Sequence, residues 1–296
     1  MHMVFTIFVV SLIVFFLVRL SGDPISVMAP PTFSQEQIDN LRRAWGLDRP
    51  LIEQYFVFAQ RAITGDFGRS VITGTPAMGL VLERLAATIQ LAAVSSIIGL
   101  MIAIPAGVIS ALRRNTFVDL FTTFAATVGT AMPNFWLGLI LILIFSVQLR
   151  MLPAFGAEHP LSLLMPAVTL GTGLAAQIAR LSRSAMLDAL SQDYVRTARS
   201  KGLSGRVVVW RHAFRNSMIP ITTAFGLQLG YLLGGAVVVE AVFAWPGLGR
   251  LLIEAINVRD ITVVQAGVLW FAITFVLINL IVDLTYSLID PRIRLS

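Results

Sequence analysis

Long stretches without a charged residue recur along the chain, separated by short clusters of charged and polar residues. A helix needs about 20 apolar residues to cross the roughly 30 Å hydrocarbon layer of a membrane. The runs that approach or exceed this length are residues 3–18, a span within 85–112, a span within 120–149, 160–179, 216–239 and 261–282. The pattern predicts an all-α membrane protein with six transmembrane helices, the first of them, in residues 1–20, being short.

Basic residues gather on alternate loops, and cytoplasmic loops are the ones enriched in Lys and Arg. Arg113 and Arg114 follow the second run, and Arg292 and Arg294 lie in the tail. The loop after the fourth run is the most basic, with Arg180, Arg183, Arg196, Arg199, Lys201, Arg206, Arg211 and Arg215. Six spans place these segments on one side. We therefore expect residues 113–119, 184–215 and the tail 286–296 to be cytoplasmic, with both termini inside.

The other side then receives residues 21–84, 150–160 and 240–260. A cleaved signal peptide is the alternative for the first run, but no A-x-A-like cleavage site follows it. In residues 21–84, Ser34 and Gln37 resemble a capping box, and Gly46 ends the predicted helix. A second helix is expected after Pro50, with its apolar face at Ile52, Tyr55, Phe56, Ala59 and Ile63 and its end at Gly65. This external two-helix segment is either a docking platform or a packed cap without a partner.

Composition supports the membrane class. The 296 residues are 56% hydrophobic and 13% charged, against about 45–50% and 25% in soluble domains, and the mean hydropathy is +0.82. No cysteine is present, which excludes disulfides and thiolate metal sites. The histidines, His2, His159 and His212, are far apart. The net charge of +6 is concentrated in loops and indicates a membrane-lipid environment, with no nucleic-acid partner.

The chain also lacks the common catalytic motifs. Its one lysine, Lys201, is followed by Gly202, whereas a Walker A loop needs lysine followed by Ser or Thr. No H-E-x-x-H or G-x-S-x-G motif is present. The carboxylates nearest to the runs, Asp119, Glu240 and Asp283, lie at run ends, where interfacial carboxylates are ordinary. No catalytic, cofactor-binding or metal-binding residue is predicted. A membrane-embedded enzyme and a proton-coupled secondary transporter are disfavoured, although a sodium site of backbone carbonyls would leave no such trace.

Prolines interrupt several runs, and the segment from Gly129 to Asn134 (GTAMPN) is the most conspicuous. It either breaks the third span and lines a cavity or makes a simple kink, and the pattern alone favours the kink.

The loop 184–215 is predicted to be a helix, a turn and a second helix. Ser191 is expected to cap the first helix, which has an apolar stripe at Tyr194, Val195 and Ala198, and Gly202 closes it. Ser204 is expected to cap the second, with Val207, Trp210 and Phe214 on one face. Such a basic hairpin needs a surface to pack against: a partner, itself or anionic lipid.

The segment DYVRTARSKGLSGRVVVWRHAFRNSMIP (193–220) resembles the cytoplasmic loop of ABC importer permeases of the dipeptide/oligopeptide/nickel family. The resemblance continues through GLDRPLIEQY (46–55), GDFGRS (65–70), LERLAATIQLA (82–92), MPNFWLG (132–138), GGAVVVEAVFAWPGLGRLL (234–252) and LINLIVDLTYSLIDPRIR (277–294). Many permeases carry E-A-A-x-x-x-G in the loop, whereas this chain has Arg196-Thr197-Ala198 before Gly202, so no role of the motif glutamate passes to Arg196.

The resemblance implies a type I ABC importer core in residues 85–285, whose ATP hydrolysis would occur in partner subunits. The implied partners are a second, homologous permease in a heterodimer, two ATP-binding subunits, an external solute-binding protein and a peptide substrate, in the inner or plasma membrane. The residues expected to couple to the ATPase are Asp193, Tyr194, Arg196, Thr197, Ala198, Gly202 and Arg206.

Neutral polar residues in the spans predict the translocation path, with Thr127, Thr130, Asn134, Thr222, Thr223 and Gln228 as its lining. Such a path suits a polar solute of no net charge, and the family favours short peptides. Glutathione-like peptides, nickel chelates and other small solutes remain as alternatives.

Overall fold

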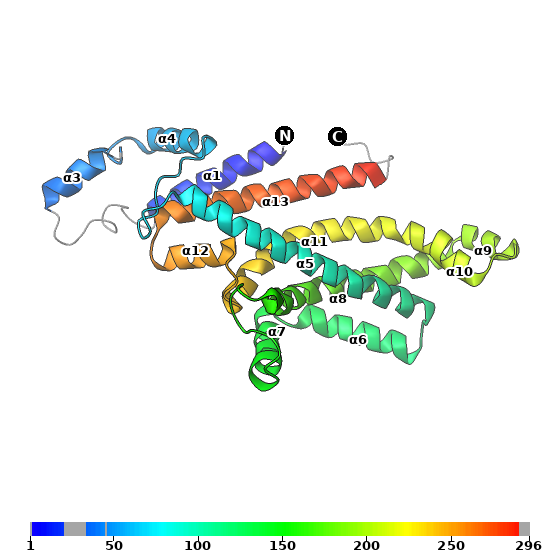
Figure 1. Ribbon diagram of the computed structural model, residues 1–296. Helices are drawn as coiled ribbons and strands as arrows, with labels where there is room; N and C mark the ends of the chain where they lie inside the picture. The colour runs from blue at the N-terminus through cyan, green and yellow to red at the C-terminus, as the bar shows by residue number, and fades with distance from the viewer. Residues whose placement is uncertain (1, 21–33, 45, 290–296) are drawn as a thin grey trace. The chain divides into compact units, whose positions relative to one another are not determined.

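The computed structural model describes residues 2–20, 34–44 and 46–289 (Figure 1). In this part of the chain the regular secondary structure is helical, apart from one isolated bridge between Arg69 and Pro76. The helices are α1 (His2–Leu20), α3 (Gln35–Ala44), α4 (Leu51–Ile63), α5 (Ala77–Leu112), α6 (Phe117–Ala131), α7 (Asn134–Leu141), η1 (Ile142–Gln148), η2 (Pro160–Leu163), α8 (Leu164–Ser191), α9 (Asp193–Ser200), α10 (Gly205–Val207), η3 (Val208–Phe214), α11 (Arg215–Val242), α12 (Leu248–Asn257) and α13 (Ile261–Ile289). The expectation of an all-α protein is confirmed.

Four helical stretches in the described residues are long and apolar enough to cross a membrane. They are Ala77–Leu112, Pro160–Ser191, Gly205–Val242 and Ile261–Val282. The α6 and α7–η1 helices make a fifth crossing if the bent pair counts as one span, and the apolar helix Met3–Arg19 is shorter than the others. All six predicted runs are therefore helical, with the first short and the third broken.

The chain divides into two compact units, each of which is described by itself. The first contains residues 1–87 and 246–277. Within it, Tyr55 of α4 packs against α1, where its ring meets Phe15 at 5.5 Å between centroids and its hydroxyl bonds the Ser11 hydroxyl at 2.8 Å. A buried cluster joins the start of α5, α12 and the start of α13, and contains Ala77, Val81, Leu85, Leu248, Ala255, Val263 and Ala266.

The two helices expected in residues 21–84 form, but the second packs only part of its predicted apolar face. The capping box is present, since Gln37 N donates to Ser34 Oγ at 3.3 Å and Ser34 N donates to Gln37 Oε1 at 2.8 Å. In α4, Tyr55 and Phe58 pack inward, whereas Ile52, Phe56 and Ile63 are exposed. The predicted apolar face is therefore only partly packed within this chain, because α1 contacts a neighbouring face of α4.

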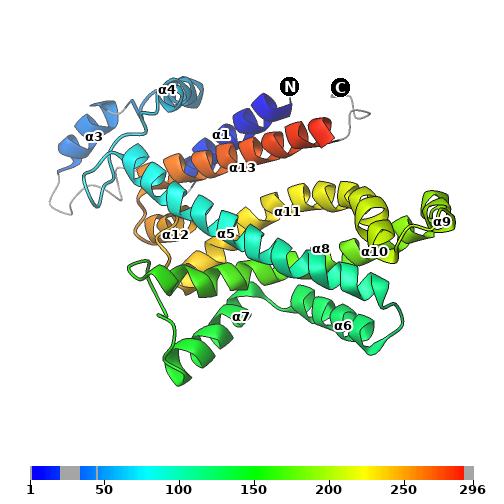
Figure 2. The same ribbon diagram turned by 45° about the vertical axis from the view of Figure 1, so that its right-hand side comes forward.

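The second unit contains residues 88–245 and 278–296, and its centre is α8. Helices α6, α7 and α11 contact α8. Figure 2 shows α9 and α10 beyond one end of α8, with α6 and α7 meeting at an angle beside it. About half of the residues of α8 are buried. This helix therefore positions both regions to which the sequence assigns a function.

Small residues bring the backbones of α5 and α8 into direct contact. A Cβ on Gly107 would lie 2.5 Å from Ser182 Cβ and 2.6 Å from the Ala179 carbonyl oxygen, and a Cβ on Gly171 would lie 2.7 Å from the Ser95 carbonyl oxygen. Distances this short leave no room for a side chain. The backbones of α5 and α8 are therefore in close contact at two positions, near Gly107 and near Gly171.

We expect Gly107→Ala to lower the thermal stability of the protein. Alanine gains up to about 1 kcal/mol of helix propensity over glycine, but overpacking costs about 1–3 kcal/mol, so the loss prevails. Gly79→Ala is the matched control, because a Cβ on this α5 glycine meets nothing within 4 Å and the propensity gain stands alone. Thermal unfolding in detergent checks both variants, and equal unfolding temperatures would contradict the close approach.

Candidate functional site

The third span is broken at Met132 and Pro133. Both residues have extended backbone, with ψ of 123° at Met132 and 135° at Pro133, and the helices on either side are bent by 105°. Proline has no N–H to continue the helical hydrogen-bond ladder, and it disfavours helical backbone at the preceding residue. The cavity-lining break, which the pattern alone ranked below a kink, is the one that the structure adopts.

A cavity of about 310 Å³ opens beside this break. It is lined by Gly129, Thr130, Met132, Pro133, Asn134, Leu170, Gly173, Leu174, Gln177, Gln228, Tyr231 and Leu232. The lining comes from α6, α7, α8 and α11, and in the described part of the chain it contains no charged side chain. Its polar groups are three carboxamides, one threonine hydroxyl and one tyrosine hydroxyl. The cavity can therefore offer hydrogen-bond donors and acceptors without a fixed charge.

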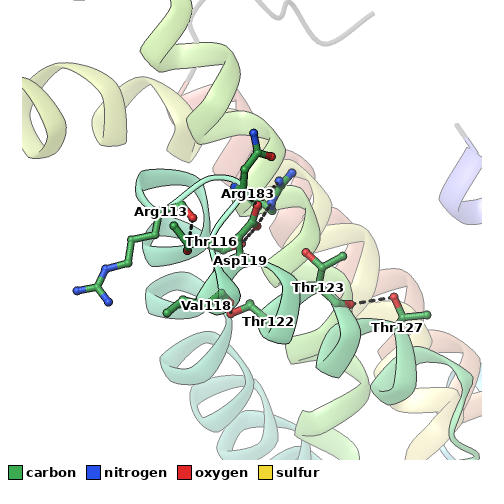
Figure 3. Close-up of polar contacts among 10 residues, drawn as sticks. Arg113, Thr116, Val118, Asp119, Thr122, Thr123, Thr127 and Arg183 are labelled. Atoms are coloured by element: carbon green, nitrogen blue, oxygen red, sulfur yellow. Dashed lines mark hydrogen bonds and ion pairs between the residues drawn. The ribbon is translucent and has the colours of Figure 1, made fainter.

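Three of the six predicted path residues line this cavity, namely Thr130, Asn134 and Gln228. The other three do not. Their hydroxyls bond the backbone of their own helices, as does that of Thr130, which donates to Ala126 O at 3.1 Å. Thr127 Oγ1 donates to the Thr123 carbonyl at 2.9 Å (Figure 3), Thr222 Oγ1 to Met218 O at 2.9 Å and Thr223 Oγ1 to Ile219 O at 3.0 Å. Threonine commonly bonds the preceding turn in this way, so its presence in a span is weak evidence for a path.

Sequence reasoning missed Gln177 and Tyr231. Gln177 lies in an apolar run one helical turn after Gly173, and Tyr231 lies three residues after Gln228. Spacings of three and four residues share a helix face, so both could have been found by projecting the runs as helices.

Glycines bracket the Asn134 carboxamide. A Cβ on Gly173 would lie 3.5 Å from Asn134 Oδ1, and a Cβ on Gly235 would lie 3.2 Å from Asn134 Nδ2. The first distance is an ordinary van der Waals contact and the second is tight, so the absence of a side chain at Gly235 leaves space for the carboxamide at the start of α7. Asn134 is thereby held at the cavity wall between α8 and α11.

The predicted loop hairpin is formed by residues 193–214, and Gly202 makes its turn. Gly202 has φ of +76°. Its N–H donates to Arg199 O at 3.0 Å, and Leu203 N donates to Ala198 O at 3.4 Å. These two bonds form a Schellman motif, whose left-handed position favours glycine. The role predicted for Gly202 in closing the helix is confirmed.

An apolar cluster, which we call the hairpin core, holds the loop hairpin on the spans. It comprises Val108, Ala111, Met186, Ala189, Val195, Ala198, Val208 and Ala213, from α5, α8, α9 and η3. Among the predicted coupling residues, Ala198 is buried in this core, whereas Asp193, Tyr194, Arg196, Thr197, Gly202 and Arg206 are exposed. The hairpin thus packs on its own chain through one face, and six of the seven predicted coupling residues lie on its exposed surface.

The second half of the hairpin differs from the prediction. Val208–Phe214 is a π-helix that continues directly into α11, so the second hairpin helix and the fifth span are one helical stretch. The wider π turn changes the 3.6-residue period, and as a result Val208 and Ala213 are buried while Val207 and Trp210 are exposed. Ser191 ends α8 and does not cap α9, because Gln192 has extended backbone before Asp193.

Two carboxylates expected to be ordinary interfacial groups are buried instead. Glu240 has no exposed surface and accepts a hydrogen bond from Thr88 Oγ1 at 2.6 Å. Asp119 is 5% exposed and forms a bidentate ion pair with Arg183, at 2.6 and 2.8 Å (Figure 3). Burial of a carboxylate requires such partners, and these partners are too distant in sequence to be read from pattern. The side chain of Asp283 lies outside the described residues.

The described residues bring together no three His, Asp or Glu side chains that could share a metal ion. The candidate site therefore has two parts. One is an uncharged cavity at the broken third span, and the other is the loop hairpin that follows the C-terminal end of α8.

Comparison with known proteins shows the family to which this chain belongs. Residues 103–295 match the family described as the binding-protein-dependent transport system inner membrane component, and residues 1–92 match its N-terminal region. The chain belongs to this family. It is thus an ABC importer permease, located in the inner membrane, and the resemblance noted in the sequence is confirmed.

The permease is similar over nearly its whole length to the glutathione transport system permease protein GsiC of Escherichia coli K12. The two are 43% identical over 290 residues, which cover 98% of this chain and 95% of the relative. The protein of the same name from Shigella dysenteriae serotype 1 matches with the same identity and coverage.

Solved structures support the fold. The methionine ABC transporter MetNI in an inward-facing conformation aligns with a TM-score of 0.62 at 21% identity, covering 72% of this chain and 97% of that one. An amino acid ABC transporter aligns with a TM-score of 0.53 at 18% identity, covering 73% and 94%. The permease therefore has the type I importer fold.

Proposed function

We propose that this permease imports short peptides, with a tripeptide such as glutathione within its range. An ABC importer permease implies a partner permease and ATPase subunits. Our proposal adds a second, homologous permease that completes the path, two ATP-binding subunits that hydrolyse ATP, and an external solute-binding protein that delivers the peptide. The chain itself then performs no catalysis.

The uncharged, carboxamide-rich cavity carries the peptide proposal. Asn134, Gln177 and Gln228 each present an N–H donor and a C=O acceptor, which are also the two groups of a peptide bond. Pairing with the peptide backbone would not depend on side-chain identity, so one cavity could accept many sequences. The 43% identity to a permease named for glutathione supports the same substrate class.

Nickel chelates are the alternative within the family. A bare nickel ion would need nitrogen, oxygen or sulfur ligands with strong donor character, and the cavity lining offers carboxamides and two hydroxyls. A chelate of low charge could still pass, so the two substrates must be separated by experiment.

The test is uptake by cells that carry the complete system, with and without this gene. Labelled glutathione, a labelled neutral dipeptide and labelled nickel are supplied in parallel. We expect deletion to abolish the binding-protein-dependent uptake of at least one of the peptides and to leave nickel uptake unchanged. Loss of nickel uptake with both peptides unaffected would overturn the peptide proposal.

The loop hairpin is proposed as the contact with an ATPase subunit. Support comes from its exposed surface, which includes Asp193, Arg196 and Thr197, and from its packing on α8 and α5 through the hairpin core. A rigid connection of this kind lets a push on the hairpin reach the spans. Ala198 would act from inside the core and not by direct contact.

We also propose that both termini and the hairpin are cytoplasmic and that α3 and α4 are external. Because the chain has no cysteine, single cysteines can be introduced at Ser34 and Ser204, which are both exposed. The cells are treated so that the outer membrane is permeable and the inner membrane stays intact. An impermeant thiol reagent should then label Ser34→Cys, and it should label Ser204→Cys only after the inner membrane is also opened. Labelling of both from outside would contradict this topology.

A further inference from the structure

Asp119, in the first turn of α6, is the meeting point of three segments. Its Oδ1 accepts hydrogen bonds from Arg183 Nε at 2.6 Å and Ser110 Oγ at 2.5 Å, and its Oδ2 accepts from Arg183 Nη2 at 2.8 Å and the backbone N of Asn115 at 3.0 Å. Figure 3 shows the Arg183 guanidinium from α8 pointing at this carboxylate. One side chain therefore fastens α6 to α5, to the connecting turn and to α8.

The pair lies between the two regions assigned a function. Along α6, Asp119 precedes the cavity-lining Thr130 by 11 residues, or about 16 Å at 1.5 Å per residue. Along α8, Arg183 follows the cavity-lining Gln177 by six residues, or about 9 Å. Past Arg183, α8 contributes Met186 and Ala189 to the hairpin core and ends at Ser191, just before α9.

The other helices have different attachments. Helix α5 is locked to α8 by backbone contact at Gly107, next to Ser182. Helix α6 is followed by the break at Met132 and Pro133, so it has no continuous helical path into α7. Its ion pair to α8 joins the buried Asp119 to the half-buried Arg183, and along α8 Arg183 is closer to the hairpin than the cavity-lining residues are.

We propose that Asp119 and Arg183 are a positioning pair that makes α6 move with α8, so that displacement of the loop hairpin reaches the cavity wall at Gly129–Met132. This inference rests on the coupling role proposed for the hairpin. Two parallel hydrogen bonds fix the angle as well as the distance between the partners, which suits transmission better than an apolar contact that can slide. Neither side chain touches the cavity, so the pair acts through the helices that carry it.

The test uses the complete transporter in proteoliposomes, with peptide uptake and peptide-stimulated ATP hydrolysis measured in the same vesicles. Asp119→Asn keeps the size and removes the charge, and Arg183→Gln does the same from α8. We expect stimulated hydrolysis within twofold of wild type and uptake reduced at least fivefold, so that less peptide enters per ATP. Arg183→Lys, which retains the charge, should recover part of this ratio.

Arg180→Gln is the matched control, because Arg180 is an exposed arginine on the same helix, three residues before Arg183. It should keep both activities. Uptake and hydrolysis that fall in proportion in Asp119→Asn and Arg183→Gln would overturn the proposal, as would unchanged uptake. Failure of both variants to insert would assign the pair to folding and also overturn it.

The hairpin assignment is tested separately by Gly202→Val, in which the ion pair is intact. Full activity of that variant refutes coupling at the hairpin, whereas a changed uptake-to-hydrolysis ratio in Asp119→Asn concerns only the pair. The two failures are therefore distinguishable.

Discussion

Replacing Gly202 by valine is expected to lower peptide uptake and peptide-stimulated ATP hydrolysis together, each by about tenfold or more, while the protein still inserts. Gly202 has φ of +76°, and a left-handed conformation costs an ordinary residue about 1–2 kcal/mol, more for a β-branched one. The backbone would relieve this strain by opening the Schellman motif. The start of α10 would then be misdirected from its partner surface.

Gly205→Val is the matched control in the same hairpin. A Cβ on Gly202 or on Gly205 meets nothing within 4 Å, but only Gly202 has positive φ. The comparison therefore separates the effect of a larger side chain from the effect of backbone strain. Gly205→Val should retain most transport activity. Equal, near-normal transport in both variants would remove the coupling role of the hairpin turn.

Asn134→Leu is expected to reduce peptide uptake at least tenfold without changing hydrolysis in the absence of peptide. Leucine has the same number and branching of heavy side-chain atoms, so the space between Gly173 and Gly235 stays filled, but the carboxamide donor and acceptor at the cavity wall are lost. Backbone groups of a peptide in the cavity would then lack a partner, at a cost of about 1–3 kcal/mol for each unpaired group.

Thr127→Val is the control for this prediction, since Thr127 lies on α6 outside the cavity lining and its hydroxyl bonds Thr123 O. Its uptake should stay near wild type. Concentration-dependent uptake of a labelled dipeptide in the complete system compares the two variants. Similar uptake in both would show that the peptide does not use the Asn134 carboxamide.

Local signals in the sequence predicted much of the fold. The capping box of Ser34 and Gln37 and the helix-ending glycine Gly202 depend on neighbours within five residues, and both form as expected. The six apolar runs are helical for the same reason. Helix α12 was missed although Leu248, Leu251, Leu252 and Ala255 have helical spacing, because its segment was read only as an external loop between two spans.

The contacts that were not predicted join residues far apart in the chain. Ser70 Oγ donates to Asp260 Oδ2 at 2.5 Å across 190 positions, and Thr88 reaches Glu240 across 152. Nothing in the local pattern distinguishes these carboxylates from solvated ones at a span end. The π segment at Val208–Phe214 similarly changes which residues are buried without a proline or glycine to mark it.

Only three of the six predicted path residues line the cavity, because residue type was used without helix geometry. Polar residue type alone selected Thr127, Thr222 and Thr223, whose hydroxyls are satisfied within their helices, and passed over Gln177 and Tyr231. A carboxamide cannot be satisfied as easily by its own turn, and carboxamides were the better indicators of the lining.

The most direct measurement of the central claim is uptake of a labelled short peptide into proteoliposomes. One set contains this permease with its partner permease, ATPase subunits and external binding protein, and a second set contains this chain alone. We predict ATP-dependent accumulation in the first set only, with no response to an imposed proton or sodium gradient in either. Gradient-driven uptake by the chain alone would contradict the account and identify a secondary transporter.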